Sequence, residues 1–172
     1  LKNHEINVKY KNNELILKGK GKIKINKEFD YVSYSFNKNN DDFEIISDID
    51  LNNISLRNKE FLKKFFPKTK DFLNLREHKV KIKYKKNYFS LSGQGKIKID
   101  KDFDNINYFI LNDKNQINFD LKVNLKKTDF IIKNINFRKN LNDTTRLNFS
   151  GSFLSDKYLK FDNLSIIEKN SK

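Results

Sequence analysis

The sequence predicts an all-β protein built from repeated antiparallel strands, each with one apolar face. Two observations predict this class. Apolar and polar residues alternate with a period of two along most of the chain. In addition, the stretch GKGKIKINKEFD at residues 19–30 returns as GQGKIKIDKDFD at residues 93–104, and the same spacing relates His4 to His78. We therefore conclude that the chain contains an internal repeat.

The repeat divides a single domain into three copies, at residues 4–77, 78–145 and, in part, 146–172. A chain of 172 residues fits one domain of ordinary size. The third copy rests on a short match, in which Leu147 corresponds to Phe89. Because the sequence contains no Met, we interpret it as a fragment of a longer protein.

The strands follow from the alternation. In residues 78–85 (HKVKIKYK), Val80 and Ile82 point to one side and the lysines between them to the other, as in a strand with one wet face. Residues 117–125 (INFDLKVNL) alternate in the same way, and residues 43–51 are their counterpart in the first copy. Polar clusters typical of turns separate the strands at residues 37–42, 85–87, 112–116 and 141–145.

One segment departs from this pattern. Residues 58–68 (NKEFLKKFFPK) begin with Asn58, which is suited to a helix N-cap, and carry apolar residues at helical spacing before Pro67. The sequence predicts a short amphipathic helix or an irregular crossover within residues 58–73. This span also accounts for the shorter spacing between the second and third copies.

The net charge of +14 raises the question of nucleic-acid binding. The basic residues are nearly all Lys, they are spread along the whole chain, and only four are Arg, the residue that nucleic-acid interfaces favour. We therefore expect solvated lysine faces, and nucleic acid is not the expected partner. The chain has no Cys, which excludes disulfides, thiolate nucleophiles and Cys-ligated metals.

Four glycines lie on the apolar side of their strands, at Gly19, Gly21, Gly93 and Gly95. Glycines at such positions either bend the sheet within an ordinary core or leave space against its face. Both interpretations remain open from the residues alone.

Candidate motifs for catalysis, metal binding and cofactor binding each lack residues that the chemistry requires. Asp100, Asp102 and Asp104 begin like a calcium loop, but Asn105 and Leu111 replace the required Gly and Glu. We expect a turn with outward carboxylates there. The first and second copies hold one His each, so neither offers a second His ligand, and no nucleophile has the required context. We expect no enzymatic activity, no metal and no cofactor.

The order of motifs resembles a known family. HKVKIKY, LSGQGKIKI, DFDNINYFI, FDLKVNL, IKNINFRK and LNFSGSF follow one another through most of the chain. This succession resembles the AsmA-like superfamily, in particular the repeating β-sheet region of bacterial envelope proteins of the YhdP and TamB type. The resemblance implies a sheet curled into a taco or half-pipe, anchored in the inner membrane, that carries lipid acyl chains across the periplasm along its apolar interior.

From these expectations we predict a non-enzymatic lipid-binding or lipid-conducting groove, with phospholipid or another acyl-chain lipid as partner and a membrane-anchored parent protein. Two alternatives remain: a structural spacer or adhesion module with a closed core, and a module that binds polyanions through its lysine faces. The predicted groove residues are Ile23, Ile25, Ile45, Ile49, Ile97, Ile99, Phe119, Leu121, Val123 and Phe149.

Overall fold

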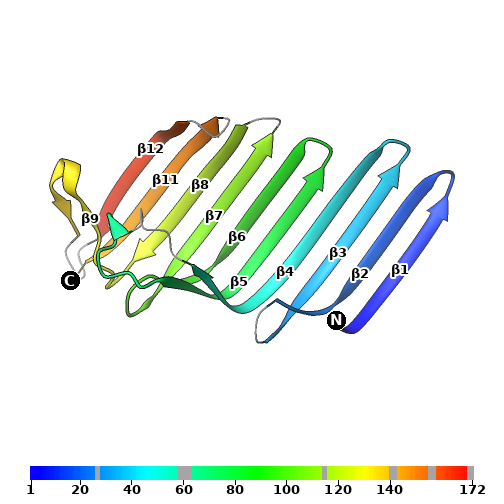
Figure 1. Ribbon diagram of the computed structural model, residues 1–172, viewed down its shortest axis with the longest axis horizontal. Coiled ribbons are helices and arrows are strands. Elements are labelled where there is room, and N and C mark those ends of the chain that lie inside the picture. Colours follow the sequence, from blue (N-terminus) through cyan, green and yellow to red (C-terminus); the bar gives the residue numbers. More distant parts are fainter. Residues whose placement is uncertain (26–27, 58–62, 114–115, 140–142, 155–157, 170–172) are drawn as a thin grey trace.

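Ten strands form one antiparallel sheet in which neighbouring strands are also consecutive along the chain, except that β9 and β10 intervene between β8 and β11 (Figure 1). A computed structural model describes residues 1–25, 28–57, 63–113, 116–139, 143–154 and 158–169. The predicted all-β fold is confirmed, and β1 and β12 are the two edges of the sheet. Its strands are β1 (Lys2–Lys11), β2 (Glu14–Lys24), β3 (Phe29–Asn39), β4 (Asp42–Arg57), β5 (Phe72–Lys85), β6 (Tyr88–Lys98), β7 (Phe103–Asp113), β8 (Gln116–Leu125), β11 (Thr144–Leu154) and β12 (Tyr158–Lys169).

The sequence repeat is also a structural repeat. Strands β1–β4 of the first copy correspond to β5–β8 of the second. Both β1 and β5 contain a register shift, between Lys2 and Glu5 and between Arg76 and Lys79. Within each shift, one residue takes a left-handed backbone, with φ of 50° at Asn3 and 53° at Glu77. These are equivalent β-bulges, and each one precedes the His of its copy.

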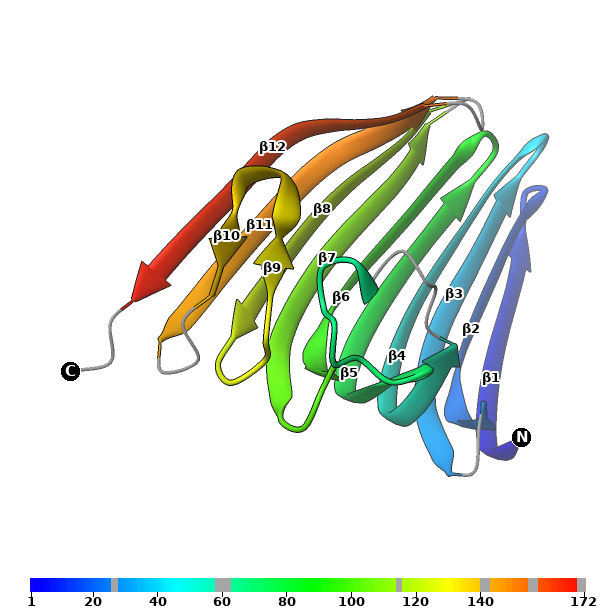
Figure 2. The same ribbon diagram turned by 60° about the vertical axis from the view of Figure 1, so that its left-hand side comes forward.

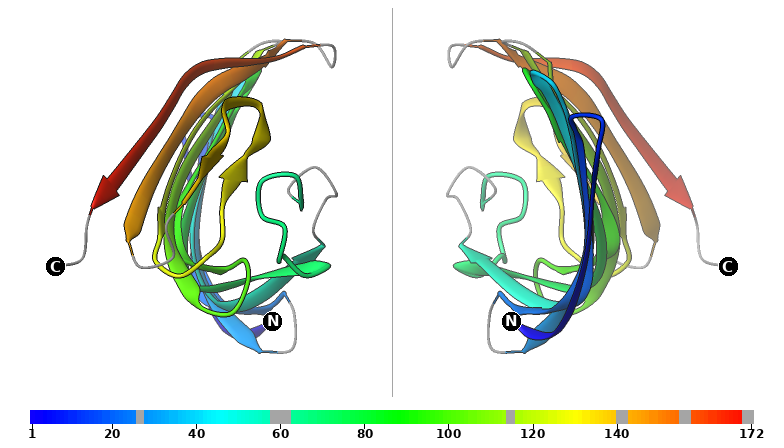
Figure 3. Two further views of the ribbon diagram at one scale, coloured as in Figure 1. Left: turned by 90° about the vertical axis from the view of Figure 1, so that its left-hand side faces the viewer. Right: turned by 90° about the vertical axis from the view of Figure 1, so that its right-hand side faces the viewer.

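The register brings a row of apolar residues from neighbouring strands to one side of the sheet. Val80, for example, pairs with Ile49 on one neighbouring strand and with Gly93 on the other. Viewed along the row of strands, the strands are bowed and the two chain insertions lie on the inner side of the bow (Figure 3). We call this inner side the apolar face.

The two insertions cover part of the apolar face, and Figure 2 shows both on the same side of the sheet. The first insertion, residues 63–71, connects to β5. The second, residues 126–139, contains the hairpin of β9 (Ile131–Ile132) and β10 (Phe137–Arg138), which form a separate two-stranded sheet, with the 3-10 helix η1 (Lys133–Ile135) between them.

The helix predicted within residues 58–73 is not confirmed. Residues 58–62 lie outside the described residues, residues 64–71 form turns and irregular backbone, and Phe72 already begins β5. The spacing of Phe65 and Phe66 has a different cause. Both rings pack against the Phe130 ring of the second insertion, with centroids 6.5 and 5.2 Å apart.

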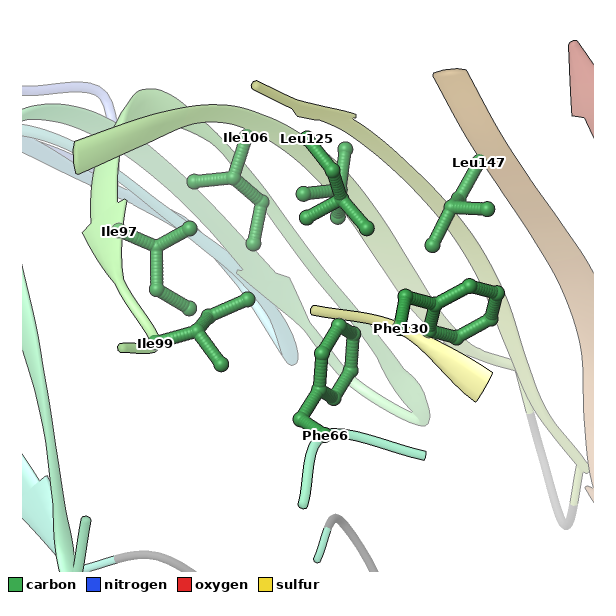
Figure 4. Packing of buried hydrophobic residues seen from close by; sticks show 8 residues of the cluster. Phe66, Ile97, Ile99, Ile106, Leu125, Phe130 and Leu147 are labelled. Atoms are coloured by element: carbon green, nitrogen blue, oxygen red, sulfur yellow. The ribbon is translucent and has the colours of Figure 1, made fainter. Parts of the chain in front are cut away.

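The hydrophobic core lies between the insertions and the second half of the sheet (Figure 4). Phe66 and Phe130 come from the insertions and face residues of β6, β7, β8 and β11. Leu125, Phe130 and Leu147 have no solvent exposure. The remaining members of this cluster are Ile97, Ile99, Ile106 and Val123.

Candidate functional site

A pocket with a wholly apolar surface lies between the insertions and the sheet, and its volume is about 300 Å³. This volume lies at the lower end of the range for small-ligand cavities. The pocket extends from the first insertion to β12. It is lined by Phe65, Phe66, Thr69, Leu73, Ile97, Ile99, Ile106, Phe119, Leu121, Val123, Phe130, Phe149, Phe153 and Phe161.

The floor of the pocket contains the predicted groove residues of the second and third copies. β8 positions three of them on one face because alternate side chains of a strand point the same way. The register continues onto β11, where Phe149 pairs with Leu121 and Gly151 pairs with Phe119. The six predicted residues that line the pocket are Ile97, Ile99, Phe119, Leu121, Val123 and Phe149.

The predicted residues of the first copy lie elsewhere on the apolar face. Ile45 and Ile49 project from β4 with the same parity as Val80 on β5, but they do not line the pocket. Ile23 lies on β2, and Ile25, just beyond the end of that strand, is 45 % exposed. The structure therefore does not bring the ten predicted residues together at one site.

The roof of the pocket was not predicted. Phe130 contacts the rings of Phe65, Phe66 and Phe137, so it joins the two insertions. The backbone N–H of Ile131 also donates to the carbonyl of Phe65 at 2.9 Å. The run Phe130-Ile131-Ile132 does not distinguish this segment in the sequence, because runs of three apolar residues also occur within β2, at residues 15–17, and within β7, at residues 109–111.

The space over the four predicted glycines is filled by side chains of the protein. A Cβ added to Gly93 would lie 2.7 Å from Cε2 of Tyr108, and one added to Gly95 would lie 2.6 Å from Cγ of His78. In the first copy, Tyr34 covers Gly19 and His4 covers Gly21. Of the two interpretations of these glycines, the one in which they leave space against the face does not hold, because rings of the protein occupy that space.

The rings of Tyr108 and His78 are themselves partly or fully buried. The pKa of the Tyr108 phenol is raised by burial. Burial also lowers the pKa of His78, against the opposing effect of a hydrogen bond from its Nε2 to the carbonyl of Lys96 at 3.0 Å. The Nδ1 atom of His78 is buried without a hydrogen-bond partner. This environment stabilises the neutral imidazole.

A buried carboxylate fixes the start of the second insertion. Asp104 accepts hydrogen bonds from the backbone N–H of Lys126, at 2.8 Å, and from the hydroxyl of Thr128. Burial raises the pKa of Asp104, and these two hydrogen bonds oppose the shift. In the first copy, Asp30 accepts an equivalent bond from the backbone of Asn52. The expectation of an outward carboxylate at Asp104 is therefore wrong.

A second carboxylate holds the base of the hairpin. Asp129 lies at its start and accepts two hydrogen bonds from the Arg138 guanidinium, at 2.8 and 3.3 Å. Burial would raise the pKa of Asp129, but Arg138 and the nearby Lys68 ammonium outweigh this effect and lower it. Burial lowers the pKa of Lys139, whose ammonium donates to the carbonyl of Lys126 at 2.7 Å. These contacts are consistent with a structural role.

The described part of the chain holds no group of three or more His, Asp or Glu side chains that could bind a metal ion. Among the same residues, no helix has the length and apolar character needed to cross a membrane. The chemistry that the pocket can support is apolar contact, because every lining side chain except Thr69 is a hydrocarbon.

The comparisons with known proteins give no relative: no family model, curated protein or solved structure matches this chain.

Proposed function

We propose that the chain is a non-enzymatic segment that binds the acyl chains of lipids on its apolar face, as part of a bacterial envelope protein that moves phospholipid between membranes. In this proposal the bowed sheet is a half-pipe, the parent protein is anchored in the inner membrane, and the segment lies in the periplasm. The location and the anchor come from the resemblance to the AsmA-like superfamily alone.

The observation that carries the proposal is the apolar pocket. Its surface offers no polar group to a headgroup, so a ligand that fits must be hydrocarbon where it is enclosed. Each methylene of an acyl chain that leaves water contributes about 0.8 kcal/mol. Because such contacts have no direction, a chain held this way can also slide.

The continuity of the apolar face supports conduction as well as binding. The pocket occupies the part of the face formed by the start of β5 and by β6 to β12, and the same face continues over the rest of β5 and over β1 to β4. There it leaves large apolar side chains in water, with Val8 58 % exposed and Tyr84 42 % exposed. Exposed apolar side chains on a continuous apolar face are consistent with a binding surface.

The alternative is a structural spacer, and the filled glycine positions favour it. Rings over Gly19, Gly21, Gly93 and Gly95 belong to an ordinary core and leave no room for a ligand at those four points. A spacer would contain the same pocket as a packing defect. The two proposals differ in whether lipid is present in the purified protein.

Mass spectrometry of lipids that co-purify with the chain tests the proposal. A matched pair of variants separates the two sides of the sheet: Phe119→Ser alters the pocket, whereas Phe109→Ser alters the opposite side of the neighbouring strand. We expect lipid with the native chain and with Phe109→Ser, and a several-fold loss with Phe119→Ser. Absence of lipid from all three folded proteins would support the spacer.

Binding to nucleic acid at low and high salt tests the polyanion alternative. Contacts between Lys side chains and phosphates weaken steeply with salt because counterions are released. Strong, salt-sensitive binding of DNA by a protein that carries no lipid would contradict the lipid proposal.

A further inference from the structure

The two insertions obstruct the apolar face at one place along the sheet. Viewed along the row of strands, residues 63–71 and the β9–β10 hairpin lie inside the bow of the sheet (Figure 3). A lipid that moves along the face from β1 towards β12 would have to pass the same space. The insertions therefore lie in the path that the proposed function requires.

Burial along the face shows where the obstruction lies. Beneath the insertions, Leu125 and Leu147 are completely buried. On the same face beyond them, Tyr84 and Val8 are exposed. Leu125 and Leu147 belong to the same packed cluster as Phe66 and Phe130 of the insertions, whereas Tyr84 and Val8 do not.

The two insertions contact each other as well as the sheet. The backbone bond between Ile131 and Phe65 and the ring contacts of Phe130 join them. The β9–β10 hairpin has its own two-stranded ladder and no place in the ten-stranded one. Asp104 and Asp129 hold its base. Over the pocket, Phe66 and Phe130 meet the sheet through side-chain packing.

From this arrangement we infer that residues 63–71 and 126–139 form a displaceable plug, which closes the pocket and blocks passage of an acyl chain along the apolar face until it lifts. The inference rests on the proposed function, because a plug matters only if an apolar ligand moves there. Lifting the hairpin about its base, which Asp104 holds through Lys126 and Thr128, breaks apolar contacts but no backbone hydrogen bond of the ten-stranded ladder. The plug thus allows control of transport within this segment.

A variant without the hairpin tests the inference. The backbone N–H of Lys139 donates to the carbonyl of Phe130 at 2.9 Å, so the two ends of the hairpin are already adjacent. Replacing residues 131–138 with Asn-Gly, a pair suited to a two-residue turn, removes the hairpin and keeps this bond. Ile135→Asn is the matched control, because Ile135 lies in η1 and is exposed.

A Trp placed at either of two positions reports whether lipid passes the plug. The chain has no Trp, so Tyr84→Trp marks the open part of the face and Phe119→Trp marks the pocket. Vesicles of brominated phosphatidylcholine are mixed with each protein, and the time course of quenching is recorded. If the open form of the plug is populated at about 0.1–10 %, quenching at position 119 will be about 10- to 1,000-fold slower than at position 84.

Removal of the hairpin should bring the two rates together, while Ile135→Asn should leave them apart. If the rates are already equal with the hairpin present, the plug is contradicted but lipid binding stands. If brominated lipid quenches neither position, the proposed function itself fails. Phe130→Ala provides a second route if the hairpin replacement does not fold, because it loosens the plug without shortening the chain; unchanged rates in folded Phe130→Ala would contradict the inference.

Discussion

At the scale of single residues, the repeat preserves pairs of a ring and a glycine. Tyr108 lies over Gly93 and His78 over Gly95, and the same pairs occur in the first copy. The centroids of the His78 and Tyr108 rings are 6.0 Å apart, as are those of His4 and Tyr34. The glycines therefore accommodate rings on the sheet surface, which explains why the repeated sequence motif contains Gly-x-Gly.

A methyl group at Gly93 should destabilise the protein because Tyr108 would have to move. We expect Gly93→Ala to lower the free energy of unfolding by about 1–3 kcal/mol, the usual cost of overpacking. The measurement is urea denaturation, with Ser92→Ala on the opposite face as control. In a Tyr108→Ala background the same change should cost much less. Equal costs in both backgrounds would show that the ring does not determine the need for glycine.

The buried imidazole of His78 should make stability depend on pH. Its pKa in the folded protein lies below the unfolded value of about 6.5 because of burial, so the unfolded chain binds a proton first as pH falls. Its contribution should therefore be fully present above pH 6.5 and decline as pH drops through 6.5 towards the folded pKa. Urea denaturation between pH 5 and pH 8 measures this, and His78→Gln should flatten the profile. An unchanged profile in the variant would contradict the assignment.

At the scale of elements, short turns set the register that brings the apolar residues to one face. Between β1 and β2, Asn12 and Asn13 have φ of 51° and 62°, and Lys11 pairs with Glu14. Two residues with positive φ are typical of a type I′ hairpin turn, which suits the twist of the strands. Asn tolerates this backbone better than most residues, which accounts for its use here.

The β1–β2 turn predicts opposite effects for two substitutions at one position. Asn13→Gly should leave stability unchanged or raise it slightly, because Gly adopts positive φ without steric cost. Asn13→Val should lower the free energy of unfolding by about 1–2 kcal/mol, the cost of a left-handed backbone for a residue with a Cβ. Thermal and urea denaturation of both variants check this. Similar stability of the two would contradict the turn assignment.

Ion pairs also stabilise the junction between β4 of the first copy and β5 of the second copy. Glu44 on β4 forms ion pairs with the ammonium groups of Lys83 and Lys85 on β5, each with an N–O distance of 3.0 Å. The hydrogen bonds from these lysines lower the pKa of Glu44. The acidic residue on β4 beside the lysines of β5 favours the pairing of these two strands, which joins the first and second copies.

At the scale of the whole molecule, the sequence predicted the sheet but not what covers it. Alternation with period two is a local signal, and it identified β5 and β8 with their apolar sides. The roof depends on contacts between Phe65 and Phe130, which are far apart in sequence and leave no local pattern. For the same reason, the helical spacing around Phe65 does not reflect a helix at residues 64–71, which form turns and irregular backbone.

The glycines show the same limit. Parity correctly placed Gly93 and Gly95 on the apolar face, but it does not reveal what lies above them. That depends on Tyr108 from the next strand and on the bulge that turns His78 towards Gly95. A bulge of this kind interrupts the alternation by one residue, at Glu77.

The most direct test of the central claim uses Phe119→Trp, with brominated and ordinary phospholipid compared at equilibrium. Phe119 lies in the pocket and pairs across the sheet with Gly151, so a single Trp there reports on the pocket. We expect brominated lipid to quench the emission and ordinary lipid not to do so, with iodide quenching weakly once lipid is bound. Equal emission with both lipids, in a protein that remains folded, would contradict lipid binding and indicate that the apolar face is only a core.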